Sequence, residues 1–158
     1  MATKEIPLTR GLVAIVDEQD YELLSTTLWH ATRGSSLRTF YAAAYIDSKY
    51  VRMHRLIIPV RDGFVVDHVD GNGLNNTRKN LRVATLSQNM FNRSAATKAR
   101  SRFKGVTHHK NGGGWQAEIR ANRRKYYLGF FKNELDAARA YDAAARELHG
   151  EFARVNGV

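Results

Sequence analysis

The stretch VDHVDGNGLNNTRKNLRVAT (residues 66–85) decides how the fold of this chain is interpreted. An apolar run, FVVDHV, leads into it, and a loop dense in asparagine and glycine follows. The run NLRVAT predicts a second short strand after this loop. Thr85 and Gln88 have the spacing of a capping box, which predicts that a helix, LSQNMFNR, begins immediately afterwards. We therefore expect two strands and a helix in direct succession.

The composition indicates a folded, strongly basic chain. It has 158 residues, a formal net charge of +10 and 43% hydrophobic residues. This length fits one domain or two small ones. Residues 98–158 hold 13 Lys and Arg against 6 Asp and Glu, which leaves 12 against 9 for residues 1–97. A polyanion is the expected partner, with its stronger electrostatic footprint in the C-terminal third.

The lack of cysteine and the lack of a long apolar segment bear on where in the cell the protein is expected. Without cysteine there is no disulfide and no thiolate zinc site, which is compatible with a reducing cytoplasm. The N-terminal MATKEIPLTRGLVAIVDEQD has no apolar signal core, and no run approaches the ~18 apolar residues of a membrane span. We expect a soluble cytoplasmic protein with no membrane partner.

The first 58 residues predict short strands and little helix. Asp17 is a candidate N-cap for a brief helix. The expected elements are a strand at 11–16, a helix at 17–25, strands at 28–32 and 38–46, and a strand that runs into a short helix at 50–58. We assign no independent chemistry to residues 1–50.

The C-terminal third predicts a small α+β unit, a three-stranded antiparallel sheet packed on one helix. Three strand-like runs, FKGVTHH, WQAEIRA and KYYLGFF, precede an alanine-rich helix from Glu134 to His149, with Asn133 as N-cap and Gly150 at its end. Alternation predicts one apolar sheet face under this helix. That face is expected to contain Trp115, Ala117, Ile119, Tyr126, Leu128 and Phe130, covered by Leu135, Ala138, Tyr141 or Ala145, and Leu148 of the helix.

His68 is a candidate for acid-base chemistry. Hydrolysis of a phosphodiester needs a base for water, a cation for the developing negative charge and a scaffold that holds both. A histidine with an ordinary pKa of ~6.5 can accept a proton at neutral pH. On a regular strand the side chain of Asp67 would point to the opposite face, so we expect the strand to end or bend here.

Residues 54–93 resemble the HNH endonucleases, in the homing-type branch of phages and introns. The matching blocks are MHRLI, VDHVDGNGLNN, NLRVAT and SQNMFNR. The resemblance implies an HNH module at 1–93 with a ββα-metal finger at about 64–93, and a phage-encoded intracellular protein. It implies that His68 is the general base and that Asp67 and Asn89 bind the metal ion. Asn80 would hydrogen-bond backbone across the loop and hold the histidine.

The last position of the motif is asparagine where the commoner form of the family has histidine. Asp67 and Asn89 would offer hard oxygen ligands, which favour Mg²⁺ or Mn²⁺ over Zn²⁺. The competing interpretation is that DHVD makes an ordinary Asx-Gly turn. We expect Asp70 to be a loop-former and His54 to be structural or DNA-contacting, with Asn72, Asn75 and Asn76 stabilising the loop or touching phosphates.

Residues 102–156 resemble the plant Apetala and ethylene-response-factor DNA-binding domain, through FKGV, WQAEIR, YYLGFF and AARAYDAAA. The resemblance implies a DNA-binding domain at 102–158 after a basic linker at 94–101. The implied DNA contacts are Lys104, Glu118, Arg120, Lys125 and Tyr127. Thr107 and His109 replace family arginines, so the plant target sequence does not carry over. Arg123 and Arg124, in a turn, are expected to contact phosphates, and a solvated basic strand face is the alternative.

These predictions combine into a two-part, metal-dependent DNA endonuclease. The finger would cut double-stranded DNA and the C-terminal sheet would locate the site, in a monomer or a homodimer. One rival is a catalytically inactive DNA-binding transcriptional regulator in which residues 54–93 keep only the shape of a finger. A second rival is a structural module that binds nucleic acid through charge alone.

Overall fold

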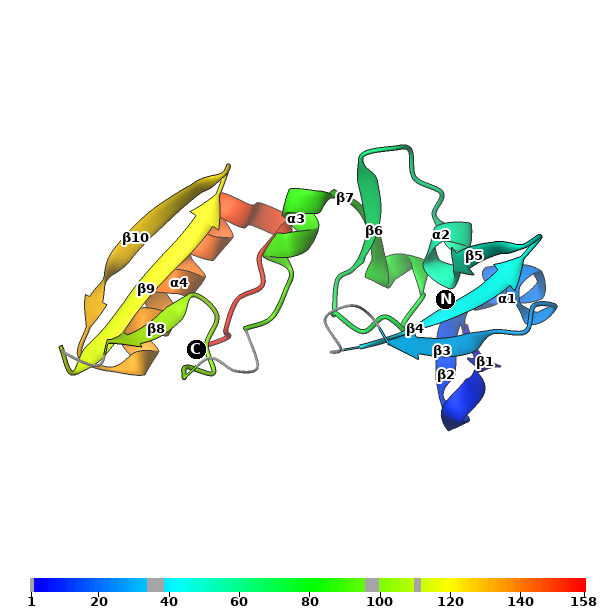
Figure 1. Ribbon diagram of the computed structural model, residues 1–158, viewed down its shortest axis with the longest axis horizontal. Coiled ribbons are helices and arrows are strands. Elements are labelled where there is room, and N and C mark those ends of the chain that lie inside the picture. The colour runs from blue at the N-terminus through cyan, green and yellow to red at the C-terminus, as the bar shows by residue number, and fades with distance from the viewer. Residues whose placement is uncertain (1, 34–38, 96–99, 110–111) are drawn as a thin grey trace. The chain divides into compact units, whose positions relative to one another are not determined.

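The chain forms two compact units, Met1–Asn89 and Met90–Val158, in the computed structural model (Figure 1). The structure describes residues 2–33, 39–95, 100–109 and 112–158. Small antiparallel sheets and a few helices make up both units, which confirms a mixed α and β protein. The predicted linker, 94–101, lies partly outside the described residues, and the domain boundaries stay predictions.

The first unit is built from three small antiparallel sheets, β1-β2, β3-β4-β5 and β6-β7. Short strands and helices alternate along it, as the turn-rich sequence predicts. The elements are β1 (Thr3–Pro7), η1 (Thr9–Gly11), β2 (Val13–Asp17), α1 (Glu18–Ser25), β3 (His30–Arg33), β4 (Phe40–Ile46), β5 (Lys49–Arg52), α2 (Met53–Ile57), β6 (Phe64–His68), η2 (Arg78–Asn80) and β7 (Leu81–Thr85).

One hydrophobic core joins the sheets of the first unit. Trp29 is its largest member, 1% exposed, and its indole N–H donates to the carbonyl of Leu24 at 2.8 Å. Since that polar group is satisfied, the ring can be buried without a desolvation cost. The core extends from β1 to β7 and includes Ile6, Val16, Leu24, Ala42, Met53, Ile57, Val66 and Leu81.

A helix follows the β6-β7 hairpin directly, in the order that the sequence predicts. This helix, α3, covers Leu86–Phe91. The backbone N–H of Thr85 donates to Oε1 of Gln88 at 2.8 Å, and the backbone N–H of Gln88 donates to the Thr85 hydroxyl at 3.2 Å. The predicted capping box is confirmed, so the start of α3 is fixed by local hydrogen bonds.

The second unit is an antiparallel sheet with strand order β10-β9-β8 and a helix packed on it (Figure 1). Asn133 caps the helix, since its Oδ1 accepts from the backbone N–H of Asp136 at 2.8 Å. The predicted architecture and the predicted cap are confirmed. The elements are β8 (Val106–His109), β9 (Gly114–Ala121), β10 (Arg124–Phe131), α4 (Glu134–His149) and η3 (Gly150–Phe152).

A β-bulge in β10 corrects part of the predicted sheet face. The pairing with β9 shifts between Tyr127 and Gly129, and Gly129 has a φ of +133°. Because an extra residue reverses the alternation, Phe131 packs on the core and Phe130 is 48% exposed. The helix prediction was wrong at Leu135, which is 42% exposed, while Ala138, Tyr141 and Ala145 are buried as expected.

Gly105 shows why the helix can approach the sheet so closely. It has a φ of +74°, and a Cβ atom at this position would lie 2.0 Å from the ring of Tyr141. Only glycine fits both the conformation and the space. Among the described residues, no helix combines the length and apolar character needed to cross a membrane.

Candidate active site

Asp67 and His68 are consecutive residues of a regularly paired strand. Asp67 is opposite Arg82 of β7, and His68 is opposite Leu81. Their side chains therefore point to opposite faces of the hairpin. The expected end of the strand comes directly after His68, where the N–H of Gly71 donates to the His68 carbonyl at 2.9 Å and closes a turn. The strand does not bend between Asp67 and His68, so no bend brings their two side chains to one face.

His68 lies in a buried ring cluster and is 5% exposed. Its ring centroid is 5.0 Å from that of His54 and 5.7 Å from that of Tyr41, both in edge contacts. Burial lowers the pKa of His68 from its ordinary value of 6.5, although the hydrogen bond with Asn76 and the carboxylates of Asp70 and Asp67 oppose the change. His68 is therefore neutral at physiological pH.

His54 of α2 is the buried neighbour of this imidazole. It is 4% exposed, and burial, with the nearby charges of His68, Arg52 and Arg55, lowers its pKa to about 3. Its ring also packs against Tyr41, with centroids 5.8 Å apart. His54 therefore stays neutral at all working pH values, and it packs against His68 without placing a charge beside it.

Asn80 closes the loop between the two strands. Its Oδ1 accepts from the backbone N–H of Asp70 at 3.0 Å, and its Nδ2 donates to Asp70 Oδ1 at 2.9 Å and to the Asn75 carbonyl at 2.8 Å. These contacts span the loop as the resemblance implies. Burial raises the pKa of Asp70, but hydrogen bonds from Asn72, Asn75 and Asn80 bring it below its ordinary value. The Asp70 carboxylate thus organises the loop.

Asp67 forms an ion pair across the hairpin. Its Oδ2 accepts from Nη2 of Arg82 at 2.9 Å and from Nε at 3.0 Å. Asn89, the other predicted metal ligand, is a half-buried residue of α3. One carboxylate and one amide oxygen form a hard donor set of the kind that Mg²⁺ and Mn²⁺ prefer, so the residues present fit such an ion. Within the described segments, no group of three or more His, Asp or Glu side chains has the arrangement of a metal site.

The N-terminal strands hold the loop from the other side, which sequence reasoning missed. Ile15 of β2 forms a parallel bridge with Asn75: its N–H donates to the Leu74 carbonyl at 2.9 Å, and its carbonyl accepts from the Asn76 N–H at 2.7 Å. The hydroxyl of Thr39 accepts from the N–H of Gly73 at 2.9 Å. Residues 1–50 therefore have a structural role: their hydrogen bonds hold the loop between β6 and β7 in place.

Asp17 also helps to hold this loop, which corrects the prediction that it caps a helix. It precedes α1, but its side chain makes no capping hydrogen bond. Its Oδ2 accepts from the backbone N–H of Arg78 at 2.8 Å, and the Arg78 guanidinium pairs with Asp20 at 2.7 and 2.8 Å. The sequence signal for this contact was a pair of acidic residues three positions apart, Asp17 and Asp20.

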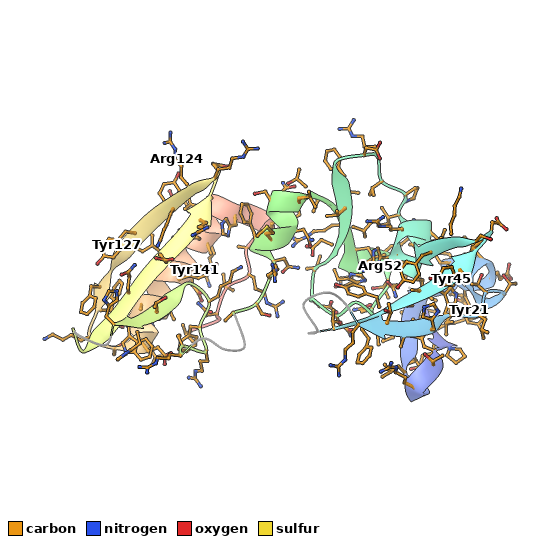
Figure 2. All side chains as sticks on the ribbon, in the orientation of Figure 1. Tyr21, Tyr45, Arg52, Arg124, Tyr127 and Tyr141 are labelled. Atoms are coloured by element: carbon orange, nitrogen blue, oxygen red, sulfur yellow. The ribbon has the colours of Figure 1, made fainter. Side chains whose placement is uncertain are left out.

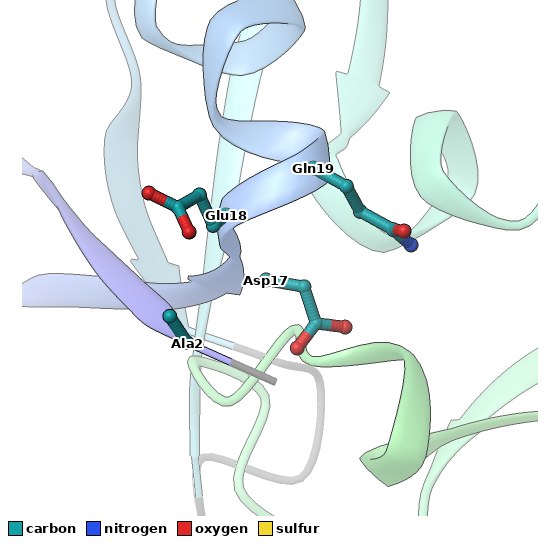
Figure 3. A pocket seen from close by; sticks show the side chains of 4 residues that line it. All are labelled: Ala2, Asp17, Glu18 and Gln19. Carbon is teal, nitrogen blue, oxygen red and sulfur yellow. The ribbon is translucent and has the colours of Figure 1, made fainter.

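A pocket of about 360 Å³ lies beside Asp17 (Figure 3). Ala2, Asp17, Glu18 and Gln19 line it. None of the predicted catalytic or metal-binding residues is among them, and the Asp17 carboxylate on its wall is already bonded to Arg78.

The open face of the second unit holds a polar network across its three strands. Nε2 of His109 donates to Gln116 Oε1 at 2.8 Å, Gln116 Nε2 donates to Glu118 Oε2 at 3.0 Å, and Lys125 Nζ lies 2.5 Å from the same oxygen. Tyr127 is 63% exposed beside it. Predicted DNA contacts from β9 and β10 are thus neighbours on one face.

The other predicted DNA contacts fall into two groups. Arg120, Arg123 and Arg124 are exposed, and Figure 2 shows Tyr127 on the outer side of β10 with Arg124 at the end of that strand. Lys104 is half-buried, and its ammonium donates to the carbonyl of Phe91, while burial lowers its pKa to about 8. The structure therefore separates Lys104 from the open face.

Comparison with known proteins identifies the family. The profile of the HNH endonucleases matches residues 52–91, the segment that contains α2, β6, β7 and α3. An uncharacterized HNH endonuclease of Acanthamoeba polyphaga mimivirus is 31% identical over 155 residues, covering 94% of this chain and 77% of that protein. The chain belongs to the HNH endonuclease family, and its relatives support a nuclease function.

Two further relatives match one part of the chain each. Protein 3.8 of Escherichia phage T7 is 31% identical over 96 residues, which cover 61% of this chain and 78% of that protein. Dehydration-responsive element-binding protein 2A of Oryza sativa subsp. japonica is 56% identical over 46 residues, 28% of this chain and 17% of that protein. The plant similarity is therefore confined to a short segment of each protein.

Proposed function

We propose that this protein is a metal-dependent DNA endonuclease in which His68 is the general base. The observation that carries the proposal is a buried imidazole with a lowered pKa inside the family-matched segment. A base that is already neutral at pH 7 can take a proton from water without prior deprotonation. A ββα-metal finger formed by β6, β7 and α3 is part of the proposal.

In the proposed reaction the residues of the finger have separate tasks. His68 takes the proton of a water molecule that attacks the phosphorus in line with the 3′ oxygen. The P–O3′ bond breaks and the leaving 3′ oxygen takes a proton from solvent, which leaves 5′-phosphate and 3′-hydroxyl ends. Asn80 keeps the loop closed around Asp70. Asp67 and Asn89 would hold Mg²⁺ or Mn²⁺, which supplies positive charge to the phosphate and the leaving oxygen. One finger per chain cuts one strand, so a monomer is expected to nick.

The second unit is proposed to be an Apetala/ethylene-response-factor-type domain that targets double-stranded DNA. The short similarity to the plant protein and the cross-strand network on the open face support this assignment. Glu118, Arg120, Lys125 and Tyr127 would face the groove, and Arg123 and Arg124 would contact phosphates. Lys104 stays a predicted contact, with its ammonium engaged at Phe91.

A nicking experiment tests the proposal. Supercoiled plasmid is incubated with the protein in Mg²⁺ and in EDTA, beside a His68→Ala variant. Metal-dependent nicking that the variant loses would support the enzyme. Equal nicking by the variant would remove His68 as the base. Sequence-selective binding with no nicking on any DNA would favour the non-catalytic regulator.

A further inference from the structure

We propose that Asn76 is the positioning residue of His68, a role that the family resemblance does not give it. It would hold the imidazole in the tautomer with hydrogen on Nε2, so that the lone pair on Nδ1 accepts the proton of water. This inference rests on the proposed function, in which His68 is the base.

The amide of Asn76 can face His68 only with its oxygen. Asn76 is 0% exposed, and its Nδ2 donates to the Leu74 carbonyl at 3.3 Å and contacts the Met53 sulfur at 3.5 Å. Its Oδ1 lies 3.0 Å from Nε2 of His68. An amide oxygen only accepts hydrogen bonds, so Nε2 must be the protonated nitrogen.

The backbone of Asn76 is fixed as firmly as its side chain. Its N–H donates to the carbonyl of Ile15 at 2.7 Å, within the parallel bridge between β2 and the loop. The side chain cannot leave Nε2 of His68 without breaking its contact to Leu74, and the backbone cannot shift without breaking the hydrogen bond to Ile15. Oδ1 of Asn76 is therefore held in position beside Nε2 of His68 before any substrate binds.

The two ring contacts of His68 do not select the tautomer. His54 and Tyr41 make edge contacts that orient the plane of the ring, and such contacts do not depend on which nitrogen carries the hydrogen. The hydrogen bonds of Asn80 described above go to Asp70 and Asn75. The tasks are thus divided: Asn80 closes the loop, and Asn76 touches the imidazole.

Nitrogen NMR of the full-length protein measures the tautomer directly. With ¹⁵N-labelled histidine, the two ring nitrogens of neutral His68 report which one is protonated, and a His68→Gln variant assigns these signals among the six histidines. We expect hydrogen on Nε2 in the wild-type protein. Hydrogen on Nδ1 of neutral wild-type His68 would overturn the inference without any variant at position 76.

Two substitutions separate positioning from general stability. In Asn76→Ala the acceptor is lost, so we expect a mixture of tautomers and a fall in kcat of about 10- to 100-fold with little change in KM. In Asn76→Asp an acceptor remains, so the Nε2–H form is kept.

Asn72→Ala is the matched control. Asn72 lies in the same loop and accepts a hydrogen bond from the Leu74 N–H at 3.1 Å, away from the imidazole. It should keep the wild-type tautomer. A folded Asn76→Ala protein that also keeps the pure Nε2–H tautomer would overturn the inference, as would loss of the Nε2–H form in Asn76→Asp. If His68→Ala still nicks DNA, the proposed base fails, whereas the NMR result on Asn76 is unaffected.

Discussion

Asp67 and Arg82 stand opposite each other on β6 and β7 and form a buried ion pair, with Nη2 of Arg82 2.9 Å from Oδ2 of Asp67. The two side chains are only 6% and 15% exposed. The carboxylate proposed to bind a metal ion is thus already neutralised by a guanidinium. A divalent ion at Asp67 would share this carboxylate with Arg82, and the two positive charges would repel each other.

The first prediction concerns this ion pair. Arg82→Gln leaves the Asp67 carboxylate buried without its partner, which is expected to cost about 3–5 kcal/mol of stability in EDTA. Bound Mg²⁺ or Mn²⁺ would replace the missing charge, so Tm should rise more on metal addition than it does in the wild-type protein. Thermal melts with and without metal check this. Asp67→Asn is the control that should gain least, and equal gains in all three proteins would refute the ligand role of Asp67.

The second prediction concerns the pH dependence of cleavage. His68 must be neutral to accept a proton, and its pKa in the folded protein is lowered from 6.5. The acid limb of the rate profile should therefore lie below pH 6.5. Initial nicking rates across this range, with the fold monitored by circular dichroism, give the answer. A limb above pH 6.5, or a flat profile in a folded protein, would contradict the assignment.

The third prediction concerns stability and His54. Its pKa is about 3 in the folded protein against 6.5 in the unfolded chain, so between these values the unfolded state binds more protons. Stability should fall as pH falls through this window, by up to about 1.4 kcal/mol per pH unit from this residue. Urea unfolding of the wild-type protein and of His54→Phe at a series of pH values isolates the contribution of His54 to the pH dependence of stability. Parallel stability curves for the two proteins would show that His54 titrates normally.

The fourth prediction concerns the open face of the second unit. Arg123→Ala and Arg124→Ala should weaken binding to all DNA sequences alike, and each should reduce the slope of log affinity against log salt by about 1. Arg120→Ala and Tyr127→Ala should change the preference among sequences. Arg139→Ala, which removes an exposed cation from α4, is the matched control. The same salt slope change in this control would mean that bulk charge alone binds DNA.

Local signals predicted the elements of this fold well. Thr85 with Gln88, and Asn133 with Asp136, begin their helices as expected, because a cap depends on residues three positions apart. The bulge at Leu128 was missed, since the extra residue is defined by pairing with another strand. Asp17 was misassigned for a similar reason: its partner, Arg78, is 61 residues away.

The same distinction holds for the candidate site. Asn80 and Asn89 were selected through the family resemblance, and His68 also through its own acid-base chemistry, and their catalytic and metal-binding roles stay predictions. The ring contact with His54 and the ion pair with Arg82 could not be foreseen, because each depends on how separate elements pack. Asn76 was assigned to the loop, but nothing in the spacing NN indicated which asparagine faces the histidine.

The parallel bridge between Ile15 and Asn75 limits how far the family-matched segment, residues 52–91, can be transferred to another protein. A graft of residues 52–91 alone into another protein would carry His68, Asn76 and Asn80 but leave β2 behind. The Leu74 carbonyl and the Asn76 N–H would then lose their partners at Ile15, and the loop would have to find substitutes in its new host. A transferable form of this segment must therefore include the strand that begins at Val13.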